Sequence, residues 1–232
     1  MNTLSPPIAD TAYALSFRQR EPAPVAPTSL LVLLHGVGGN ETNLANLAAG
    51  VPADTLVVLP RGPLQLGAGQ FAWFRVVFTA AGPQIVADEA EASRRTLIDF
   101  IGQLQAAHRV TPQRTVVAGF SQGGIMSASV ALSAPERVSG FGVLSGRILP
   151  ELEPVIAARE RLASLHGLIL HGRDDSKLPV IWAERADGWL DRLGVDHITR
   201  LYPGDHGLSA TMVEDFHTWL AQRLPAQNTA GS

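Results

Sequence analysis

The feature that most constrains the fold of this chain is a short motif between two apolar patterns. Residues 114–118 (RTVVA) form a β-branched run typical of a buried strand, and residues 124–134 carry apolar side chains at near-helical spacing. Between them lies Gly119-Phe120-Ser121-Gln122-Gly123, a G-x-S-x-G sequence. A serine at such a sharp strand-to-helix turn holds a strained backbone and points its hydroxyl outward, while the glycines leave room for the turn. The pattern indicates a nucleophile elbow centred on Ser121.

The rest of the chain alternates between expected strands and expected helices. Strands are predicted at 12–18, 30–34, 55–59, 138–144, 168–170 and 197–201, with the first at an edge of the sheet. Helices are predicted at 44–49, from 88 to about 104, at 149–165, at 180–193 and from about 208 to 220. Apolar strands that alternate with helices predict an α/β fold, with a mostly parallel sheet covered by helices on both faces.

Some segments carry more specific expectations. Residues 1–11 and 227–232 are expected to be loose. Residues 60–86 are expected to form one long loop, which is usually functional when it interrupts a compact domain. Asp88 is expected to cap the helix that follows it, with Glu91 at the capping-box position.

Length and charge bound the class of protein. A chain of 232 residues, 46% of them hydrophobic, fits a single α/β domain over residues 1–232. The formal net charge of -3 and the scattered arginines give no basic surface for nucleic acid or anionic membrane. The N-terminal residues lack a basic segment followed by an apolar one, and no run approaches 18 apolar residues. A cytoplasmic enzyme without stable membrane insertion is therefore expected.

Residue usage excludes several chemistries. The chain has no cysteine, which excludes disulfides, thiolate metal sites and a cysteine nucleophile, and it has no H-E-x-x-H sequence. The glycine-rich stretch at residues 35–42 (HGVGGNET) lacks the lysine of a P-loop and has Glu41 where a dinucleotide motif needs a glycine. No cofactor and no metal are therefore expected.

A nucleophilic serine needs a base, and in a parallel sheet both must lie at the carboxyl ends of the strands. His206 follows the last expected strand in a glycine-flanked turn and comes after Ser121 in the chain, as the order Ser, Asp, His requires. His35 and His171 also lie at strand ends, where bonding within the turn is the expected role. The histidines expected to have no catalytic role are His108, His166, which we place at the end of a charged helix, His197 and His217.

The residues alone leave the acid of the triad open. Asp174 and Asp175 both follow the strand that precedes the last one, and spacing does not decide between them. Asp205 is a third candidate, although neighbours on a tight turn such as Asp205 and His206 rarely point at each other. For the oxyanion, backbone donors are expected from the amide of Gln122, at the start of the elbow helix, and from the amide of Val37.

Taken together, these stretches resemble the phospholipase/carboxylesterase family of α/β-hydrolases, which also includes the acyl-protein thioesterases. The resemblance covers about residues 12–224. It rests on the G-F-S-Q-G elbow, the L-H-G-x-G-G turn, the pair Trp73-Phe74, an H-G-x-x-D-x-x-V-P pattern that begins at His171 and has Leu178 in place of valine, and His206-Gly207. The family pattern assigns the triad aspartate to Asp175. It implies a central sheet without a large lid domain, and family members often dimerise, so a homodimer is among the expectations.

The resemblance also implies an activity. It predicts a serine carboxylesterase that hydrolyses short- to medium-chain acyl esters of small molecules through an acyl-serine intermediate. The loop from Pro60 to Trp73 is similar to the bacterial esterase branch and lacks the Pro-Val-Thr signature of acyl-protein thioesterases. Thioester or lysophospholipid hydrolysis by the same triad is the alternative, and a silent hydrolase fold that only binds a ligand is a further one. Phe71, Trp73, Phe74 and Phe78 are candidates for the wall of the acyl site, with core packing as the competing interpretation for Trp73 and Phe78.

Overall fold

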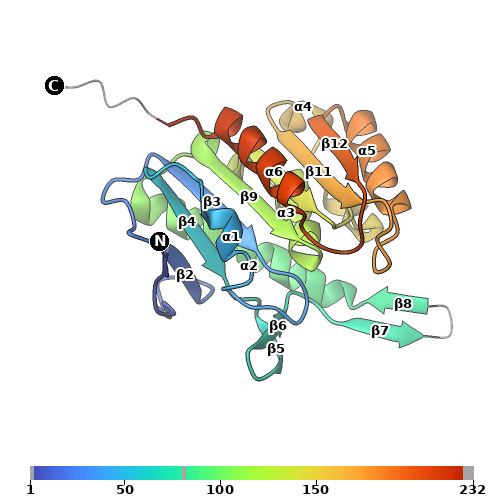
Figure 1. Cartoon of the computed structure of the whole chain (residues 1–232), viewed down its shortest axis with the longest axis horizontal. Helices are drawn as coiled ribbons and strands as arrows, with labels where there is room; N and C mark the ends of the chain where they lie inside the picture. Colours follow the sequence, from blue (N-terminus) through green and yellow to red (C-terminus); the bar gives the residue numbers. More distant parts are fainter. Residues whose placement is uncertain (1–2, 80–81, 227–232) are drawn as a thin grey trace.

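The computed structural model describes residues 3–79 and 82–226, and an eight-stranded sheet forms its centre (Figure 1). The strand order is β1-β2-β4-β3-β9-β10-β11-β12. Six neighbouring strands run parallel, namely β4, β3, β9, β10, β11 and β12. At one edge, β2 pairs antiparallel with β4, and β1 pairs antiparallel with β2. The strands are β1 (Thr3–Leu4), β2 (Phe17–Glu21), β3 (Ser29–Leu34), β4 (Thr55–Pro60), β9 (Thr115–Phe120), β10 (Gly140–Leu144), β11 (His166–Gly172) and β12 (Asp196–Tyr202).

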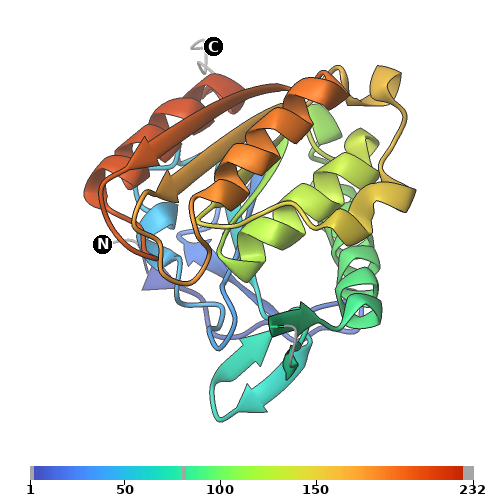
Figure 2. The same ribbon diagram turned by 90° about the vertical axis from the view of Figure 1, so that its right-hand side faces the viewer.

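Helices cover both faces of this sheet. They are α1 (Ala45–Ala48), α2 (Ala87–His108), α3 (Gln122–Ser133), α4 (Arg159–Leu162), α5 (Ile181–Leu193) and α6 (Ala210–Arg223). Helices α1 and α6 lie on one face, and α2, α3 and α5 on the other (Figure 2). Along β3, Leu30 and Val32 face the second group while Leu31 and Leu33 face the first, so the strand is buried on both sides. This confirms the α/β-hydrolase architecture with a mostly parallel sheet.

The N-terminal region differs from the prediction. Residues 3–4 pair with β2 rather than lying loose, and β2 begins at Phe17 instead of residue 12. Hydrophobic alternation could not locate this strand because it buries a cation. The guanidinium of Arg20 is buried and donates hydrogen bonds to backbone carbonyls, including those of Val51 and Pro52.

The stretch expected as one long loop contains two β-hairpins. Strand β5 (Leu64–Gly67) pairs with β6 (Gln70–Ala72), and β7 (Val76–Thr79) pairs with β8 (Gly82–Ile85). Both hairpins project from the body of the domain (Figures 1 and 2). Such short strands have too few residues for a period to be recognised, which is why the sequence pattern indicated a loop.

Three other expectations are wrong. Helix α2 has Val86 at its N-cap, so Asp88 lies inside the first turn rather than at the capping position, and Glu91 pairs with Arg94. The helix expected over residues 149–165 is broken into a 3₁₀ turn (Pro150–Val155) and α4, since Pro154 has no amide hydrogen to donate. His166 begins β11 rather than ending a helix. The predicted tail from Gln227 lies outside the described residues, and none of the helices that the structure describes could span a membrane.

Candidate active site

The elbow is held by close packing of its backbone between β9 and α3. Ser121 has φ 55° and ψ -117°, a conformation that non-glycine residues rarely adopt. A Cβ atom at Gly123 would lie 1.9 Å from the carbonyl oxygen of Leu34, and one at Gly119 would lie 2.4 Å from the carbonyl carbon of Gly123. Only glycine fits at these two positions, so the motif is required by the packing of the turn.

Two other side chains form a hydrogen-bonded chain with this serine. In the turn after β12, Nε2 of His206 lies 2.9 Å from Oγ of Ser121, and Nδ1 lies 2.7 Å from Oδ2 of Asp175. Because the carboxylate only accepts hydrogen bonds, Nδ1 carries the proton and Nε2 is free to accept from the serine hydroxyl. The ring of Phe120 lies 4.9 Å from the imidazole, centroid to centroid. The structure therefore brings together residues 85 positions apart in the chain.

The structure separates the three acidic candidates. Asp175 is buried, and its Oδ1 accepts hydrogen bonds from the amides of Lys177 (2.9 Å) and Leu178 (2.7 Å), which fixes the carboxylate toward His206. Asp174 is exposed and faces the amide of Gly204 at 3.3 Å. Asp205 accepts from the amides of Ser176 and His206, and these hydrogen bonds lower the pKa of Asp205 to about 2. Asp205 thus stabilises the turn, as expected, and does not contact the imidazole ring.

A second histidine contacts the buried aspartate. The side chains of His171 and Asp175 are both fully buried, and Nε2 of His171 lies 2.7 Å from the carbonyl oxygen of Leu178 and 3.3 Å from Oδ2 of Asp175. Both neighbours are acceptors, so Nε2 carries the proton. Nδ1 is buried and has no hydrogen-bond partner among the described residues. The sequence predicted turn bonding for His171 but gave no sign of its contact with Asp175.

The two amides expected to bind the oxyanion flank the serine. A Cβ atom on Gly36 would lie 3.3 Å from Cβ of Ser121, which places the turn after β3 directly against the elbow. The amides of Val37 and Gln122 make no hydrogen bond within the described part of the chain. The side chain of Gln122 is turned away from solvent, because its Oε1 accepts from the amide of Trp73 and its Nε2 donates to the carbonyl of Phe74, each at 2.7 Å.

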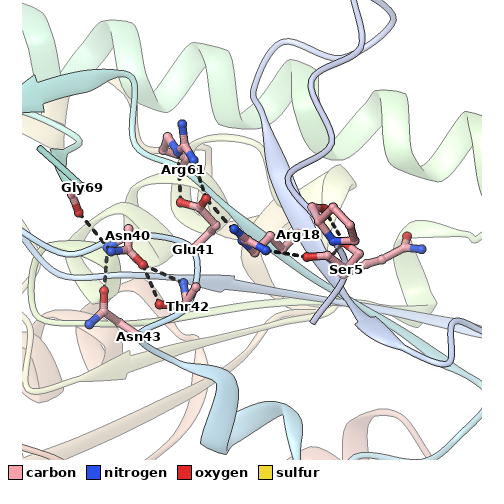
Figure 3. A network of polar contacts seen from close by, with 10 residues as sticks. Ser5, Arg18, Asn40, Glu41, Thr42, Asn43, Arg61 and Gly69 are labelled. Atoms are coloured by element: carbon pink, nitrogen blue, oxygen red, sulfur yellow. Dashed lines mark hydrogen bonds and ion pairs between the residues drawn. The ribbon is translucent and has the colours of Figure 1, made fainter. Parts of the chain in front are cut away.

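A polar network centred on Asn40 and Glu41 directly follows the glycine turn in the chain (Figure 3). The buried carboxylate of Glu41 accepts hydrogen bonds from Arg61 (Nε to Oε2, 3.0 Å) and from Arg18 (3.4 Å). Asn40 donates to the carbonyl of Gly69 in the β5–β6 hairpin. From the sequence we considered Glu41 only because it stands where a dinucleotide-binding motif needs a glycine. The ion pair between Glu41 and Arg61 could have been suspected, because Glu41 comes just after the glycine turn and Arg61 just after the next strand.

Glu41→Gln is expected to lower the free energy of unfolding by about 2 kcal/mol at pH 7, because it removes a charged acceptor from Arg61. The hydrogen bond from Arg61 lowers the pKa of Glu41 to about 2. Because the pKa of Glu41 is lower in the folded state, the stabilisation is complete when the pH is above the pKa of the same carboxyl in the unfolded chain. It is lost as the pH falls toward the folded-state pKa of about 2. Urea unfolding of the wild type and of Glu41→Gln, at pH 7 and at pH 3, should therefore show a smaller difference in the free energy of unfolding at pH 3 than at pH 7.

Glu136→Gln is the matched control, since it removes an exposed pair with Arg161. It should change the free energy of unfolding by less than about 0.5 kcal/mol at either pH. An equal effect of the two substitutions would contradict the assigned importance of Glu41.

The aromatic candidates occupy different environments. Trp73 and Phe74 have 0% and 1% of their surface exposed and belong to the main hydrophobic core, so neither offers a face to a bound acyl group in this conformation. Core packing is therefore the role observed for both, with the indole of Trp73 also donating to the carbonyl of His35. Phe71 is half-buried beneath the guanidinium of Arg61, and the side chain of Phe78 lies outside the described part of the structure.

The other histidines are engaged elsewhere. His35 is buried and accepts the amide hydrogen of Gly62 at Nε2 (2.9 Å), so its Nδ1 donates to the carbonyl of Gly36 (2.7 Å), and burial lowers the pKa of His35. This is the turn bonding that the sequence predicted. His166, His197 and His217 bond to Asp196, Asp187 and the carbonyl of Leu47 respectively. Within the described residues, no group of three His, Cys, Asp or Glu side chains is arranged to hold a metal ion.

Comparisons with known proteins place this geometry in context. Residues 21–224 match the model of a family described as Phospholipase/Carboxylesterase. Acyl-protein thioesterase 1 of Mycosarcoma maydis is 31% identical over 230 residues, covering 88% of this chain and 94% of that protein. A probable carboxylesterase SOBER1-like of Arabidopsis thaliana is 24% identical over 215 residues, covering 87% of this chain and 81% of that one.

Solved structures show the same fold. The crystal structure of esterase PE8 has a TM-score of 0.76 and 27% identity, covering 87% of this chain and 96% of that chain. A carboxylesterase from Mesorhizobium loti has a TM-score of 0.78 and 22% identity, covering 94% and 99% of the two chains.

Proposed function

The chain belongs to the phospholipase/carboxylesterase family of serine hydrolases, and on this basis we propose that it is a carboxylesterase for short- to medium-chain acyl esters of small molecules. The observation that carries the proposal is the hydrogen-bonded chain from Ser121 through His206 to Asp175. Ser121 is the nucleophile, His206 the general base and Asp175 the group that orients the imidazole. The alternative of thioester hydrolysis draws support from relatives named acyl-protein thioesterase.

The reaction proceeds in two halves. His206 accepts the proton of Ser121 at Nε2 while Oγ attacks the ester carbonyl carbon, and the amides of Val37 and Gln122 donate to the oxygen that becomes negative. Collapse of this intermediate breaks the bond to the alcohol, which leaves with the proton from His206. Water then repeats the sequence on the acyl-serine and releases the acid.

His171 should support this reaction through Asp175. We expect His171→Leu to lower kcat by about 10-fold to 100-fold with little change in KM, because the carboxylate loses a buried donor and shifts relative to His206. His171→Gln should retain most of the activity, since its side-chain amide has two N–H groups and can donate from the position of Nε2 to Oδ2 of Asp175 as well as to the carbonyl of Leu178. Steady-state kinetics on both variants, with equal melting temperatures as the criterion of intact folding, checks this. Equal losses in the two variants would contradict it.

The substrate class is tested with a panel of 4-nitrophenyl esters from acetate to palmitate and a matched series of thioesters. Butyrate to octanoate esters should give the highest kcat/KM, with palmitate and the thioesters at least about tenfold lower. One extra methylene in an apolar site changes the ratio of kcat/KM between two substrates by about 10-fold or more. An acyl site of limited length therefore gives a clear maximum of kcat/KM at one acyl chain length. A maximum at palmitoyl thioester would favour the alternative function.

A further inference from the structure

Arg147, which forms no ion pair with any residue that the structure describes, lies next to the proposed site. The segment Ser145-Gly146-Arg147 follows β10 and contacts the elbow, because a Cβ atom on Gly146 would lie 3.0 Å from the carbonyl oxygen of Ser121. It also contacts the base turn, where Oγ of Ser145 donates to the carbonyl of Gly207 at 3.3 Å. Successive Cα atoms are about 3.8 Å apart. The backbone of Arg147 is therefore one residue removed from a residue that packs against the backbone of Ser121.

The side chain of Arg147 is half-buried, and its guanidinium stacks 4.5 Å above the ring of Trp182 at the start of α5. It makes no hydrogen bond or ion pair with any residue that the structure describes, and its Nε is buried. Burial lowers the pKa of Arg147, with the charge of Glu151 acting in the opposite direction. Stacking uses only the face of the guanidinium, so the N–H groups of its two terminal nitrogens, unlike the buried Nε, remain available to a ligand.

A cavity of about 340 Å³ adjoins the same tryptophan. Its lining includes Ile148 and Pro150, which follow Arg147, and Trp182, Arg185, Trp189 and Arg192 on α5. Arg185 also stacks on Trp182, at 4.9 Å, and neither Arg185 nor Arg192 forms an ion pair within the described residues. Glu184 is the acidic residue in the lining. The volume suits a small ligand, and the lining suits an apolar body that carries negative charge.

We propose that Arg147, stacked on Trp182 and close in the chain to residues that contact the elbow, is an anion subsite that selects esters carrying a carboxylate at a distance from the scissile bond. This inference rests on the proposed esterase function and names its substrate class. A carboxylate would meet the free N–H edge of Arg147, which is suited to bidentate hydrogen bonding. Arg185 and Arg192 would add attraction at longer range, weakened by salt.

The test compares esters of similar size that differ in charge. Two pairs are used: 4-nitrophenyl hydrogen adipate with methyl 4-nitrophenyl adipate, for an acyl-side carboxylate, and 4-acetoxybenzoate with its methyl ester, for an alcohol-side carboxylate. For at least one pair, the wild-type enzyme should prefer the charged ester in kcat/KM by about 10-fold to 100-fold, as expected for hydrogen bonds between charged groups. This preference should fall as sodium chloride is added.

Arg147→Met should reduce the preference for the charged ester by about tenfold or more, since it keeps an apolar side chain over Trp182 but removes the charge. Arg161→Met removes the same charge from an exposed pair with Glu136 and should leave the preference unchanged. The wild-type measurements need no variant to fold. If the wild-type enzyme hydrolyses the neutral esters without preferring either charged one, or if Arg147→Met leaves the preference intact, the subsite is overturned while the esterase function stands. Failure of the wild type to hydrolyse any ester would overturn both.

Discussion

Ser121→Ala is expected to lower kcat for a short-chain ester by about 10⁴-fold to 10⁶-fold, because the variant has no nucleophile to form the acyl-enzyme. Some rate above the uncatalysed reaction should remain, since the oxyanion donors and the binding site are intact. The fold should tolerate the change, as alanine keeps the Cβ atom of the turn and removes only the hydroxyl. Steady-state hydrolysis of 4-nitrophenyl butyrate by both proteins measures the effect.

Ser129→Ala provides the matched control for this prediction. Ser129 lies in the same helix as the elbow, and its hydroxyl donates only to the carbonyl of Ile125 one turn earlier. Its loss should alter kcat by no more than about twofold. A Ser121→Ala protein with more than about one tenth of the wild-type kcat would show that a different group attacks the ester.

Asp175→Asn should lower kcat by about 10⁴-fold. An asparagine amide at this position either donates to Nδ1 of His206 or loses the interaction, so the imidazole no longer keeps its Nε2 free to accept the serine proton. The side chain of Asp175 is fully buried, so bulk solvent does not reach this position to replace the missing acceptor. Asp174→Asn should cost less than about fivefold, because that side chain is exposed and faces only the amide of Gly204.

Asp174→Asn is the matched control for Asp175→Asn, since each substitution removes one negative charge from the same loop. The assignment is wrong if Asp174→Asn proves the more damaging change.

The parts of the site that the sequence predicts are those fixed by local backbone requirements. The elbow needs glycine at positions 119 and 123 because the backbone of Leu34 and the turn itself occupy the space of any side chain. The turn containing Val37 follows a continuous apolar strand that is easy to recognise, and the turn containing His206 follows the last expected strand. Chain order and the carboxyl edge of a parallel sheet then bring these turns together.

Interactions that depend on distant partners could not be predicted in this way. The choice between Asp174 and Asp175 depends on which carboxylate faces inward, and the residues alone left it open. The contact of His171 with Asp175 and the stacking of Arg147 on Trp182 join segments whose relative placement is set by tertiary packing. Aromatic residues near the site looked available for substrate, yet Trp73 and Phe74 are part of the core.

Errors in the fold have the same origin. Asp88 is a residue type that often caps helices, but α2 begins one residue before it. The first turns of α2 are stabilised by ion pairs with arginines, including Arg75, which lies just before the second hairpin. Residues 17–21 form a strand although their polar side chains break the expected alternation, because the buried Arg20 finds its hydrogen-bond partners in loops far along the chain. Local propensity is overridden in both places by contacts that periodicity cannot register.

The most direct test is the mass of the protein during turnover. The enzyme is mixed with excess 4-nitrophenyl butyrate, quenched in acid within milliseconds, and analysed intact and after proteolysis. We predict one butyryl group per chain, located on the peptide that contains Ser121 and absent from Ser121→Ala. A butyryl group on any other residue, or a burst of nitrophenol equal to the enzyme concentration with no acyl group on Ser121, would contradict the proposed mechanism.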